Sequence, residues 1–393
     1  MNAGPRVALV QDALPYMGGA ERVLEAVLEI FPDAPIFTLV FNRRRFKGTV
    51  FENHPVYSSF IDRLPWSNRH YRNYLPLFPL AIEQIDLRGF DVILSFSYAV
   101  AHGVLTRPDQ VHISFTYTPL RQAWTNYHGF LKHAGLDRGP KSWTARLLLH
   151  YLRLWDFSAA SRVDHLVAIS QWVSGLIRKA YRRSSSVIYP PVDLDKFQPG
   201  WPRENYYIAV SRLASHKRVD LIVEAFSKLG LPLIVVGDGP EYEHLARLAK
   251  PNVRLLGWQS DRQIRGLLGK AKAFVHAAEE DFGIAIVEAQ AAGCPAIAYG
   301  GGGALETVIS GSTGVFFPQQ TVESLVESVE RFESSETIFD TSDLRWNAGR
   351  FSKKRFQHEV IDLVSRTWGP LQSRDHKYWL ETNEQLRVTQ QIR

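Results

Sequence analysis

The sequence has few of the features that mark several large classes of protein. It contains a single cysteine, Cys294, which excludes a disulfide within the chain and favours a reducing compartment. No apolar run approaches the roughly 20 residues needed to cross a bilayer. We expect no signal peptide, because residues 1–5 are followed at once by a strand-like run at 7–10. A fold held by internal disulfides and a helical membrane-spanning protein are therefore not expected.

The chain also has little that resembles a metal site. Asp193 and Asp195 could share an ion from one face of a strand, but they lie in a proline-rich stretch with no third ligand nearby. Five histidines fall in no spacing such as His-Glu-x-x-His: His102, His112, His165, His216 and His244. We therefore expect neither a metal nor a cofactor.

The composition is that of a folded protein with a preference for anionic partners. The chain has 393 residues, enough for two domains, with 45% hydrophobic and 22% charged residues. Its net charge is +6 and its pI is near 9.3. Nucleotide phosphates, an acidic membrane face and nucleic acid all fit this charge, and composition does not choose among them.

Strand and helix patterns alternate along both halves, which predicts two doubly wound parallel sheets in an α/β fold. The proline-rich stretch 189–199 predicts a stiff connector. We predict a first domain at 1–190, a hinge at 191–200, a second domain at 201–370 and a polar tail at 371–393. The predicted strands are 6–11, 36–40, 91–96, 111–115, 163–170, 185–189, 206–210, 233–236, 253–256, 273–276 and, as the last, 295–299.

The stretch 278–308 carries the clearest chemistry. Glu280 and Glu288 are eight positions apart, and the apolar run between them favours a helix. Eight residues at about 100° each leave the two carboxylates about 80° apart, so one helical face cannot hold both. We place Glu280 on the loop and Glu288 two turns into the helix. The helix start then offers free N–H groups that attract phosphates and sugar hydroxyls, from Phe282, Gly283 and Ile284.

Three other sites follow predicted strands. Arg212 and Lys217 would bring two cations to the carboxyl edge of the second sheet, where a diphosphate could be held, or they simply begin a solvated helix. Gly18 and Gly19 would let the backbone approach a phosphate, or they only turn the chain. Tyr117 follows the strand 111–115 and should lie at the carboxyl edge of the first sheet.

The segment 43–82 mixes basic and aromatic residues. Such mixtures occur where a protein lies on a bilayer or grips an amphiphilic substrate, although a charge run is more often a solvated face. The residues concerned include Arg43, Arg44, Arg45, Trp66, Arg69, Tyr71, Arg72, Tyr74 and Phe78.

With these pieces placed, the chain resembles a retaining glycosyltransferase of the GT-B architecture, family 4, most closely over 206–317. The marks are E-x7-E at Glu280 and Glu288, R-x4-K at Arg212 and Lys217, and the runs V-G-D-G-P and G-G-A-L-E-T-V. Three sequence segments are similar to those of bacterial enzymes that use GDP-mannose: E-E-D-F-G-I-A-I-V-E-A-Q-A-A-G, Y-T-P-L-R-Q-A-W and P-L-F-P-L-A-I-E. Those enzymes build O-antigen or exopolysaccharide on a lipid carrier.

The resemblance implies two Rossmann-like domains facing a cleft, the first for the acceptor and the second for the nucleotide sugar. Glu288 would hold the ribose hydroxyls and Glu280 would contact the donor sugar. Arg212 and Lys217 would neutralise the departing diphosphate. The amides at the helix start would bind the sugar hydroxyls or the phosphate, and the Gly18-Gly19 turn would cover the pyrophosphate. The base would lie near the stretch from Gly257 to Ser260.

Tyr117 departs from the family pattern. Many members carry histidine there, thought to hydrogen-bond the donor sugar near the reacting carbon, whereas a phenol cannot become a cation near neutral pH.

The expected function is transfer of a hexose, mannose from GDP-mannose, to a lipid-linked or polysaccharide alcohol without metal. We expect a cytoplasmic protein that contacts the inner face of the cell membrane through 43–82, with no nucleic acid partner. Alternatives are a UDP- or dTDP-sugar donor, a glycoside hydrolase using Glu280 and Glu288, and a non-catalytic scaffold with the same fold.

Overall fold

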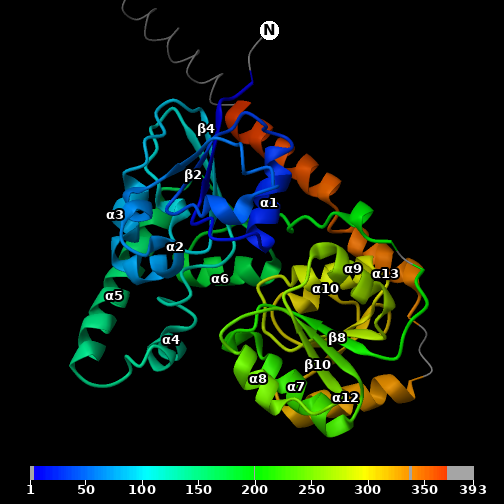
Figure 1. The fold of residues 1–393 in the computed structure, drawn as a ribbon. Coiled ribbons are helices and arrows are strands. Elements are labelled where there is room, and N and C mark those ends of the chain that lie inside the picture. The colour runs from blue at the N-terminus through cyan, green and yellow to red at the C-terminus, as the bar shows by residue number, and fades with distance from the viewer. Residues whose placement is uncertain (1–3, 199, 336–338, 370–393) are drawn as a thin grey trace, which may run out of the picture. The chain divides into compact units, whose positions relative to one another are not determined.

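The computed structural model of the protein describes residues 4–198, 200–335 and 339–369, with the backbone alone at Asn68. The chain divides into two compact units. Of the described residues, the first comprises 4–169, 173–188 and 357–369, and the second comprises 170–172, 189–198, 200–335 and 339–356. Each unit is built around one parallel sheet with helices on its faces (Figure 1).

The first sheet has seven strands in the order β3-β2-β1-β4-β5-β6-β7, and every neighbouring pair is parallel. The strand order reverses beside β1, as it does in doubly wound sheets whose ligands collect at the carboxyl ends of the strands. The strands are β1 (Val7–Gln11), β2 (Ile36–Thr38), β3 (Val56–Ser58), β4 (Val92–Ser97), β5 (Val111–Thr116), β6 (His165–Ala168) and β7 (Ser186–Val187).

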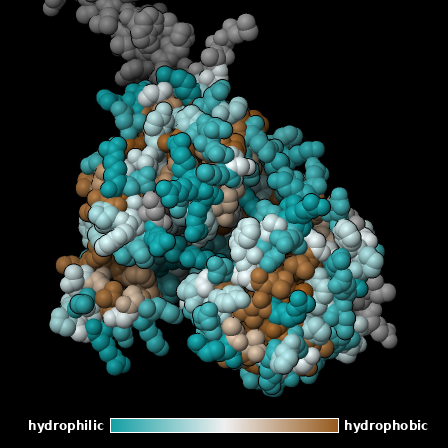
Figure 2. All heavy atoms as spheres, in the orientation of Figure 1, coloured by the Kyte–Doolittle hydropathy of each residue, from teal (hydrophilic) through white to brown (hydrophobic). Residues whose placement is uncertain are grey.

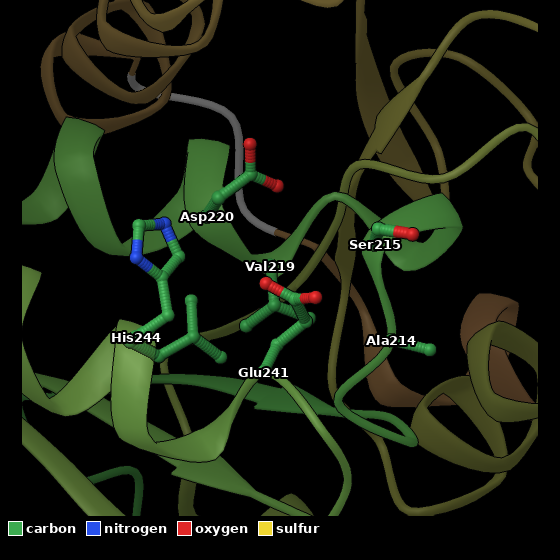
Figure 3. A pocket seen from close by; sticks show the side chains of 7 residues that line it. Ala214, Ser215, Val219, Asp220, Glu241 and His244 are labelled. Atoms are coloured by element: carbon green, nitrogen blue, oxygen red, sulfur yellow. The ribbon is translucent and has the colours of Figure 1, made fainter. Parts of the chain in front are cut away.

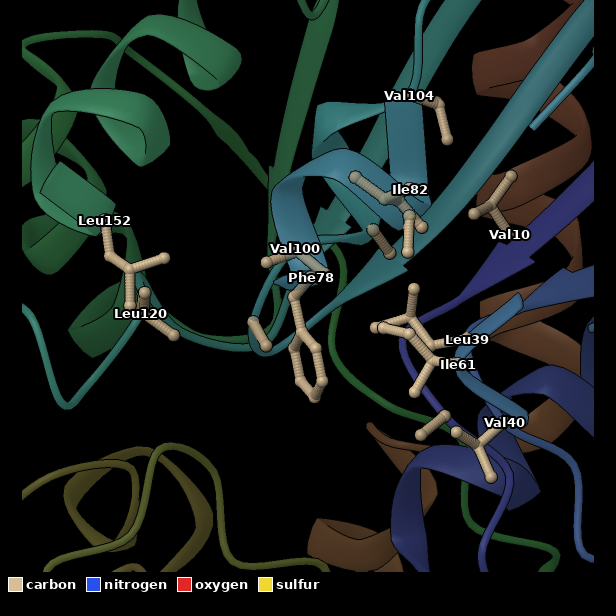
Figure 4. Packing of buried hydrophobic residues seen from close by; sticks show 14 of the residues in the cluster. Val10, Leu39, Val40, Ile61, Phe78, Ile82, Val100, Val104, Leu120 and Leu152 are labelled. Atoms are coloured by element: carbon tan, nitrogen blue, oxygen red, sulfur yellow. The ribbon is translucent and has the colours of Figure 1, made fainter. Parts of the chain in front are cut away.

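The helices of the first unit connect these strands. They are α1 (Gly19–Leu28), α2 (Ser67–His70), α3 (Phe78–Glu83), α4 (Tyr127–His133), α5 (Pro140–Ser161) and α6 (Gln171–Tyr181), with short turns η1 (Arg43–Phe46), η2 (Phe60–Arg63), η3 (Tyr71–Leu77) and η4 (Ala101–Gly103). Figure 4 shows part of the core that they enclose, in which Val10 of β1 lies near Leu39, Ile61 and Ile82. Burial of these aliphatic side chains drives the packing of the unit.

The second sheet has six parallel strands in the order β10-β9-β8-β11-β12-β13. Its strands are β8 (Tyr207–Val210), β9 (Leu233–Val236), β10 (Val253–Gly257), β11 (Ala273–His276), β12 (Ala296–Tyr299) and β13 (Gly314–Phe317). Its helices and turns are η5 (Leu194–Lys196), η6 (Ser215–Lys217), α7 (Val219–Leu229), α8 (Tyr242–Leu248), α9 (Asp261–Lys270), α10 (Ile284–Ala291), α11 (Ala304–Thr307), α12 (Val322–Ser334) and α13 (Thr341–Gly349).

The predicted α/β class and the two Rossmann-like sheets are confirmed, and each predicted strand overlaps an observed one. Two strands were not predicted. β3 is three residues long and mostly exposed, so it has no hydrophobic pattern to detect. β13 follows β12 in the sheet, so the prediction that the strand at 295–299 is the last is wrong.

The division into units differs from the predicted domains in two places. Residues 353–369 form a helix whose part from Gln357 on belongs to the first unit, where the Gln357 amide donates to the Ala26 carbonyl at 3.0 Å. Within the predicted hinge, Val192 pairs with the Phe351 carbonyl at 2.8 Å and belongs to the second unit. The predicted tail at 371–393 lies outside the described residues. Among the helices that the structure describes, none is long and apolar enough to cross a membrane.

Candidate functional site

The loop between β11 and α10 carries the residues on which the sequence prediction rests. Gly283 caps α10 with φ +87°, a left-handed conformation that favours glycine, and the helix begins at Ile284. Glu280 therefore lies on the loop, as predicted. Glu288 is the fifth residue of α10, so the prediction that it lies two turns into the helix is wrong by about one turn. The Ile286 N–H donates to the carbonyl of the cap residue Gly283 at 3.0 Å. The amides before it precede the first complete helical turn, where a helix has no carbonyl to offer them.

Lys217 and Glu280 form an ion pair at the carboxyl edge of the second sheet. Lys217 ends η6, on the loop after β8, and Glu280 follows β11, the neighbouring strand in the sheet. Both side chains are about one fifth exposed, so solvent reaches the pair without surrounding it. Two motifs that are 63 residues apart in the sequence thus meet at one point.

His276 is buried beside this pair and was not predicted as a site residue. Its Nε2 lies 3.8 Å from the Glu280 carboxylate, and no hydrogen bond to this nitrogen is found among the described residues. Burial lowers the pKa of His276 to about 4, although the Glu280 charge acts in the opposite direction. The imidazole is therefore neutral near neutral pH and offers Glu280 a polar neighbour without a charge.

Two glycines of the G-G-A-L-E-T-V motif pack directly against the backbone of the loop that carries Glu280. The Gly303 N–H donates to the Glu280 carbonyl at 2.8 Å. A Cβ at Gly302 would lie 2.3 Å from that carbonyl oxygen, and one at Gly303 would lie 2.4 Å from the Phe282 Cα. These distances are far below van der Waals contact, so only glycine permits the two loops to approach this closely.

Arg212 lies exposed on the loop after β8, which the V-G-D-G-P motif holds in place. A Cβ at Gly237 would lie 1.8 Å from the Ser211 carbonyl oxygen, and one at Gly239 would lie 2.2 Å from that of Leu213. The two glycines of this weak motif therefore let the loops after β8 and β9 pack backbone against backbone.

A small hollow of about 90 Å³ lies next to this loop, lined by Ala214, Ser215, Val219, Asp220, Glu241, His244 and Leu245 (Figure 3). None of the predicted site residues lines this hollow.

The other predicted residues of the second unit frame the same edge. Phe282 is buried, with its ring against Tyr189 and Phe351 at 5.7 and 5.2 Å between centroids. Gly257 ends β10 with φ +66°, and its carbonyl accepts the Gly237 N–H at 2.9 Å. Phe282 thus anchors the start of α10 to the core, while Gly257 turns the chain out of the sheet.

Gly18, Gly19 and Tyr117 form a separate group in the first unit. Gly18 caps α1, whose first residue is Gly19. The Tyr117 hydroxyl donates to the Ala20 carbonyl at 3.4 Å, which places the phenol beside the helix start. Burial raises the pKa of Tyr117 well above that of a free phenol, so it remains a neutral hydrogen-bonding group.

Glu21 lies at this helix start and was missed by the sequence reasoning. It is the third residue of α1 and accepts a hydrogen bond from the Gly18 backbone, as in one half of a capping box. Burial raises its pKa to about 7. The sequence held a signal, because an acidic residue three positions after a helix cap is typical of this arrangement.

The segment 43–82 divides its aromatic residues between the core and the surface. Tyr71 and Phe78 are buried and stack on each other with centroids 6.2 Å apart. Trp66 is 81% exposed, and Arg69 and Arg72 are exposed as well. Two of the aromatic residues therefore serve packing.

A metal ion at Asp193 would compete with lysine side chains for the carboxylate. The Asp193 carboxylate is paired with Lys196 at 3.3 Å and with Lys353 at 3.2 Å. No group of three His, Cys, Asp or Glu side chains suited to a metal occurs within 4–198, 200–335 and 339–369.

Residues 17–196 match the family described as Glycosyltransferase Family 4, and residues 192–355 match the family described as Glycosyl transferases group 1. The two glycosyltransferase models together span residues 17–355. The boundary between the two matched regions falls at 192–196, close to where the structure passes into its second unit.

The known proteins similar to this chain share limited identity with it. An uncharacterised glycosyltransferase of Methanocaldococcus jannaschii is 25% identical over 54% of this chain and 61% of its own length. A GDP-mannose-dependent alpha-(1-6)-phosphatidylinositol monomannoside mannosyltransferase of Mycobacterium tuberculosis is 28% identical over 42% of this chain and 51% of its own length. The chain thus spans about half of each of these relatives.

The solved structure of Anabaena HepE in complex with UDP has the same fold as this chain. Its TM-score is 0.67 with 18% identity, and the match covers 92% of this chain and 100% of that one. The predicted GT-B architecture is therefore confirmed at the level of the fold.

Proposed function

We propose that this protein transfers a hexose from a nucleotide diphosphate sugar to a hydroxyl group of an acceptor, with retention at the anomeric carbon. The observation that carries this proposal is the contact of Lys217 with Glu280 beside the start of α10. A hydrolase using Glu280 and Glu288 would leave the cations Arg212 and Lys217 without a role. A departing diphosphate needs such cations, and Lys217 contacts Glu280 at the proposed site.

Departure of the diphosphate is the difficult step, and the proposed site supplies positive charge where the negative charge develops. Arg212, Lys217 and the first amides of α10 would stabilise the leaving phosphate, and each such donor is worth about 3–4 kcal/mol in this kind of site. The bond from the anomeric carbon to the phosphate oxygen breaks as the acceptor oxygen bonds on the same face. The leaving phosphate oxygen takes the acceptor's proton. Because the cations are side chains, we propose that no metal is needed.

We propose GDP-mannose as the donor, with Glu288 on the ribose hydroxyls and the base beyond Gly257. Support comes from relatives named as GDP-mannose-dependent enzymes, one of which is 34% identical over 107 residues. The solved structure of HepE contains UDP. A UDP-sugar is therefore the competing proposal for the donor.

We propose that the acceptor is a lipid-linked sugar or a polysaccharide. We also propose that the protein acts at the inner face of the cell membrane. The sequence resemblance supports the acceptor. The exposed basic residues of the segment 43–82 would favour an acidic lipid surface.

The proposal is tested by replacing Lys217 and removing metal. Transfer to the acceptor by Lys217→Ala should fall by about 100-fold or more, because a charged donor to the leaving group is lost. The exposed Lys228 on α7 gives a matched control, and Lys228→Ala should keep normal turnover. Addition of a chelator should leave the unmodified protein active. Near-normal turnover in Lys217→Ala, or loss of activity on chelation, contradicts the mechanism.

The donor is tested by thermal shift with GDP, UDP and dTDP side by side. A ligand that binds only the folded state raises the melting temperature, so GDP should give the largest shift. A larger shift with UDP identifies a UDP-sugar as the donor. No shift with any of them favours the non-catalytic scaffold.

A further inference from the structure

Helix α5 presents two apolar faces, only one of which is covered. Leu149, Leu152 and Ala159 are buried against the first unit. On the opposite side lies a stripe of large apolar side chains, which we call the α5 stripe: Trp143 (79% exposed), Leu147 (70%), Tyr151 (50%), Leu154 (58%) and Phe157 (45%). Their spacings of four, four, three and three residues keep all five within about 120° around the helix.

An exposed stripe of this kind is unusual in a protein that is elsewhere well packed. Single exposed apolar residues need no explanation, but a contiguous run along four turns marks a surface that another body covers. Hydrophobic side chains gather over this part of the first unit in Figure 2, where α5 lies in Figure 1.

The charges around the α5 stripe identify the kind of partner. Exposed basic side chains cluster at the start of the helix and on the preceding segment: Lys132, Arg138 and Lys141. Arg146 and Arg153 flank the stripe along one side, lying over the Tyr127 ring at 5.9 and 5.2 Å. Between residues 120 and 155 the only acidic residue is Asp137. Apolar and aromatic side chains beside such a basic margin match the interior and the headgroups of an anionic bilayer.

Hydrogen bonds join the C-terminal half of α5 to the rest of the first unit. The Trp155 indole N–H donates to the Glu83 carboxylate of α3 at 2.9 Å, and Arg162 donates to the same oxygen at 2.9 Å. The Asp156 carboxylate accepts from the Trp124 indole at 2.7 Å and the Tyr181 hydroxyl at 2.9 Å. The stripe is therefore a preformed surface, which need not pay an ordering cost on binding.

We propose that the α5 stripe inserts into the headgroup region of an anionic lipid bilayer and is the principal membrane contact of this protein. The surface itself carries this inference, and only its link to a lipid-linked acceptor rests on the proposed function. The proposed membrane contact thus lies on α5, outside the segment 43–82. Insertion of a helix parallel to the membrane plane needs no spanning helix.

Vesicle sedimentation tests the proposal on the full chain without any sugar, so its result is independent of the transfer activity. The unmodified protein should bind vesicles of equal parts phosphatidylglycerol and phosphatidylcholine, and bind vesicles of phosphatidylcholine alone more weakly. Added salt should reduce binding to the anionic vesicles. The double variant Trp143→Ser with Leu147→Ser should bind at least about tenfold more weakly, because two buried apolar contacts are lost.

Matched controls separate docking from folding. Trp346→Ser removes another exposed tryptophan (68%), on α13 of the second unit, and should leave vesicle binding unchanged. Lys141→Ser keeps the stripe and should weaken binding by roughly fivefold. Circular dichroism should show unaltered folding in each variant. Failure of the unmodified protein to bind anionic vesicles overturns the proposal, as does binding by the double variant equal to that of Trp346→Ser. A dimer that the double variant dissociates also overturns it, because a second copy then covers the stripe.

Discussion

At the scale of single residues, His276 shows how burial beside the site couples folding to pH. A histidine has an ordinary pKa of 6.5, and burial lowers that of His276 to about 4. Between these values the unfolded chain binds a proton that the folded protein does not. The stability that the neutral histidine contributes is thus present above pH 6.5 and lost as the pH falls toward 4. At about pH 5 the loss from this one group is about 2 kcal/mol.

The variant His276→Gln isolates this effect, because glutamine is polar but does not titrate. We expect the free energy of unfolding of the second unit to fall less between neutral pH and about pH 5 in His276→Gln than in the unmodified protein. Hydrogen exchange of the slowest amides in β11 and β12 measures it. An equal pH dependence in both proteins excludes His276 as the titrating group.

Gly303 should tolerate no side chain. A Cβ there would lie 2.4 Å from the Phe282 backbone, so Gly303→Ala must push the loop that carries Glu280 out of place. We expect at least a tenfold loss of the proposed hexose transfer, because small displacements of positioning groups cost this much. Gly266 in α9 has open space around it and is the control, since Gly266→Ala should leave transfer intact. Equal activity of the two variants means that the loop adapts.

The residues of the site could be predicted from the sequence only where a motif spans them. The motifs that contain Lys217 and Glu280 placed both at the edge of the second sheet, and the structure brings them into contact. His276 could not be predicted, because a single histidine at the end of a strand has the same pattern as an ordinary core residue. Its proximity to Glu280 depends on how the loop folds back after β11.

At the scale of elements, Asp12 fixes the loop after β4. Its two carboxylate oxygens accept four backbone N–H groups, from Tyr98 at 2.5 Å, Ala99 at 2.9 Å, Val100 at 2.6 Å and Ala101 at 2.7 Å. Asp12→Asn would turn an amide group toward two of these donors. We expect the free energy of unfolding to fall by about 2–3 kcal/mol, because buried hydrogen bonds to a charge are lost.

Urea unfolding of Asp12→Asn and of a surface control measures this difference. Asp86 is exposed and paired with Arg88 at 2.7 Å, so Asp86→Asn should change stability by less than about 1 kcal/mol. Faster hydrogen exchange in η4 should accompany Asp12→Asn. Similar losses in the two variants contradict the anchoring role.

Elements were predictable in proportion to how much apolar surface they bury. β1, β4 and β5 are buried along their whole length and were found as apolar runs. α10 was placed correctly at its start, since Gly283 marks it, and that start fixes Glu288 as the fifth residue, little more than one turn into the helix. β3 depends on pairing with β2 for its existence, and a local pattern cannot reveal that pairing.

At the scale of the whole molecule, the chain completes its first unit with residues from its far end. The sequence predicted a second domain to residue 370, because a helical pattern alone does not say which core its apolar face covers. Val360 in this helix is fully buried, whereas the next residue, Ile361, is 43% exposed. Val360→Ala should therefore lower the stability of the first unit by about 1–2 kcal/mol, and Ile361→Ala should have little effect.

Hydrogen exchange distinguishes the two units in this experiment. In Val360→Ala, peptides from α1 should exchange faster, since Gln357 of the same helix bonds to Ala26 and Glu29 there. Peptides from α7 in the second unit should not change. Faster exchange in α7 alone would show that the helix 353–369 packs with the second unit. An equal effect of Ile361→Ala would show that burial of the Val360 side chain does not stabilise the first unit.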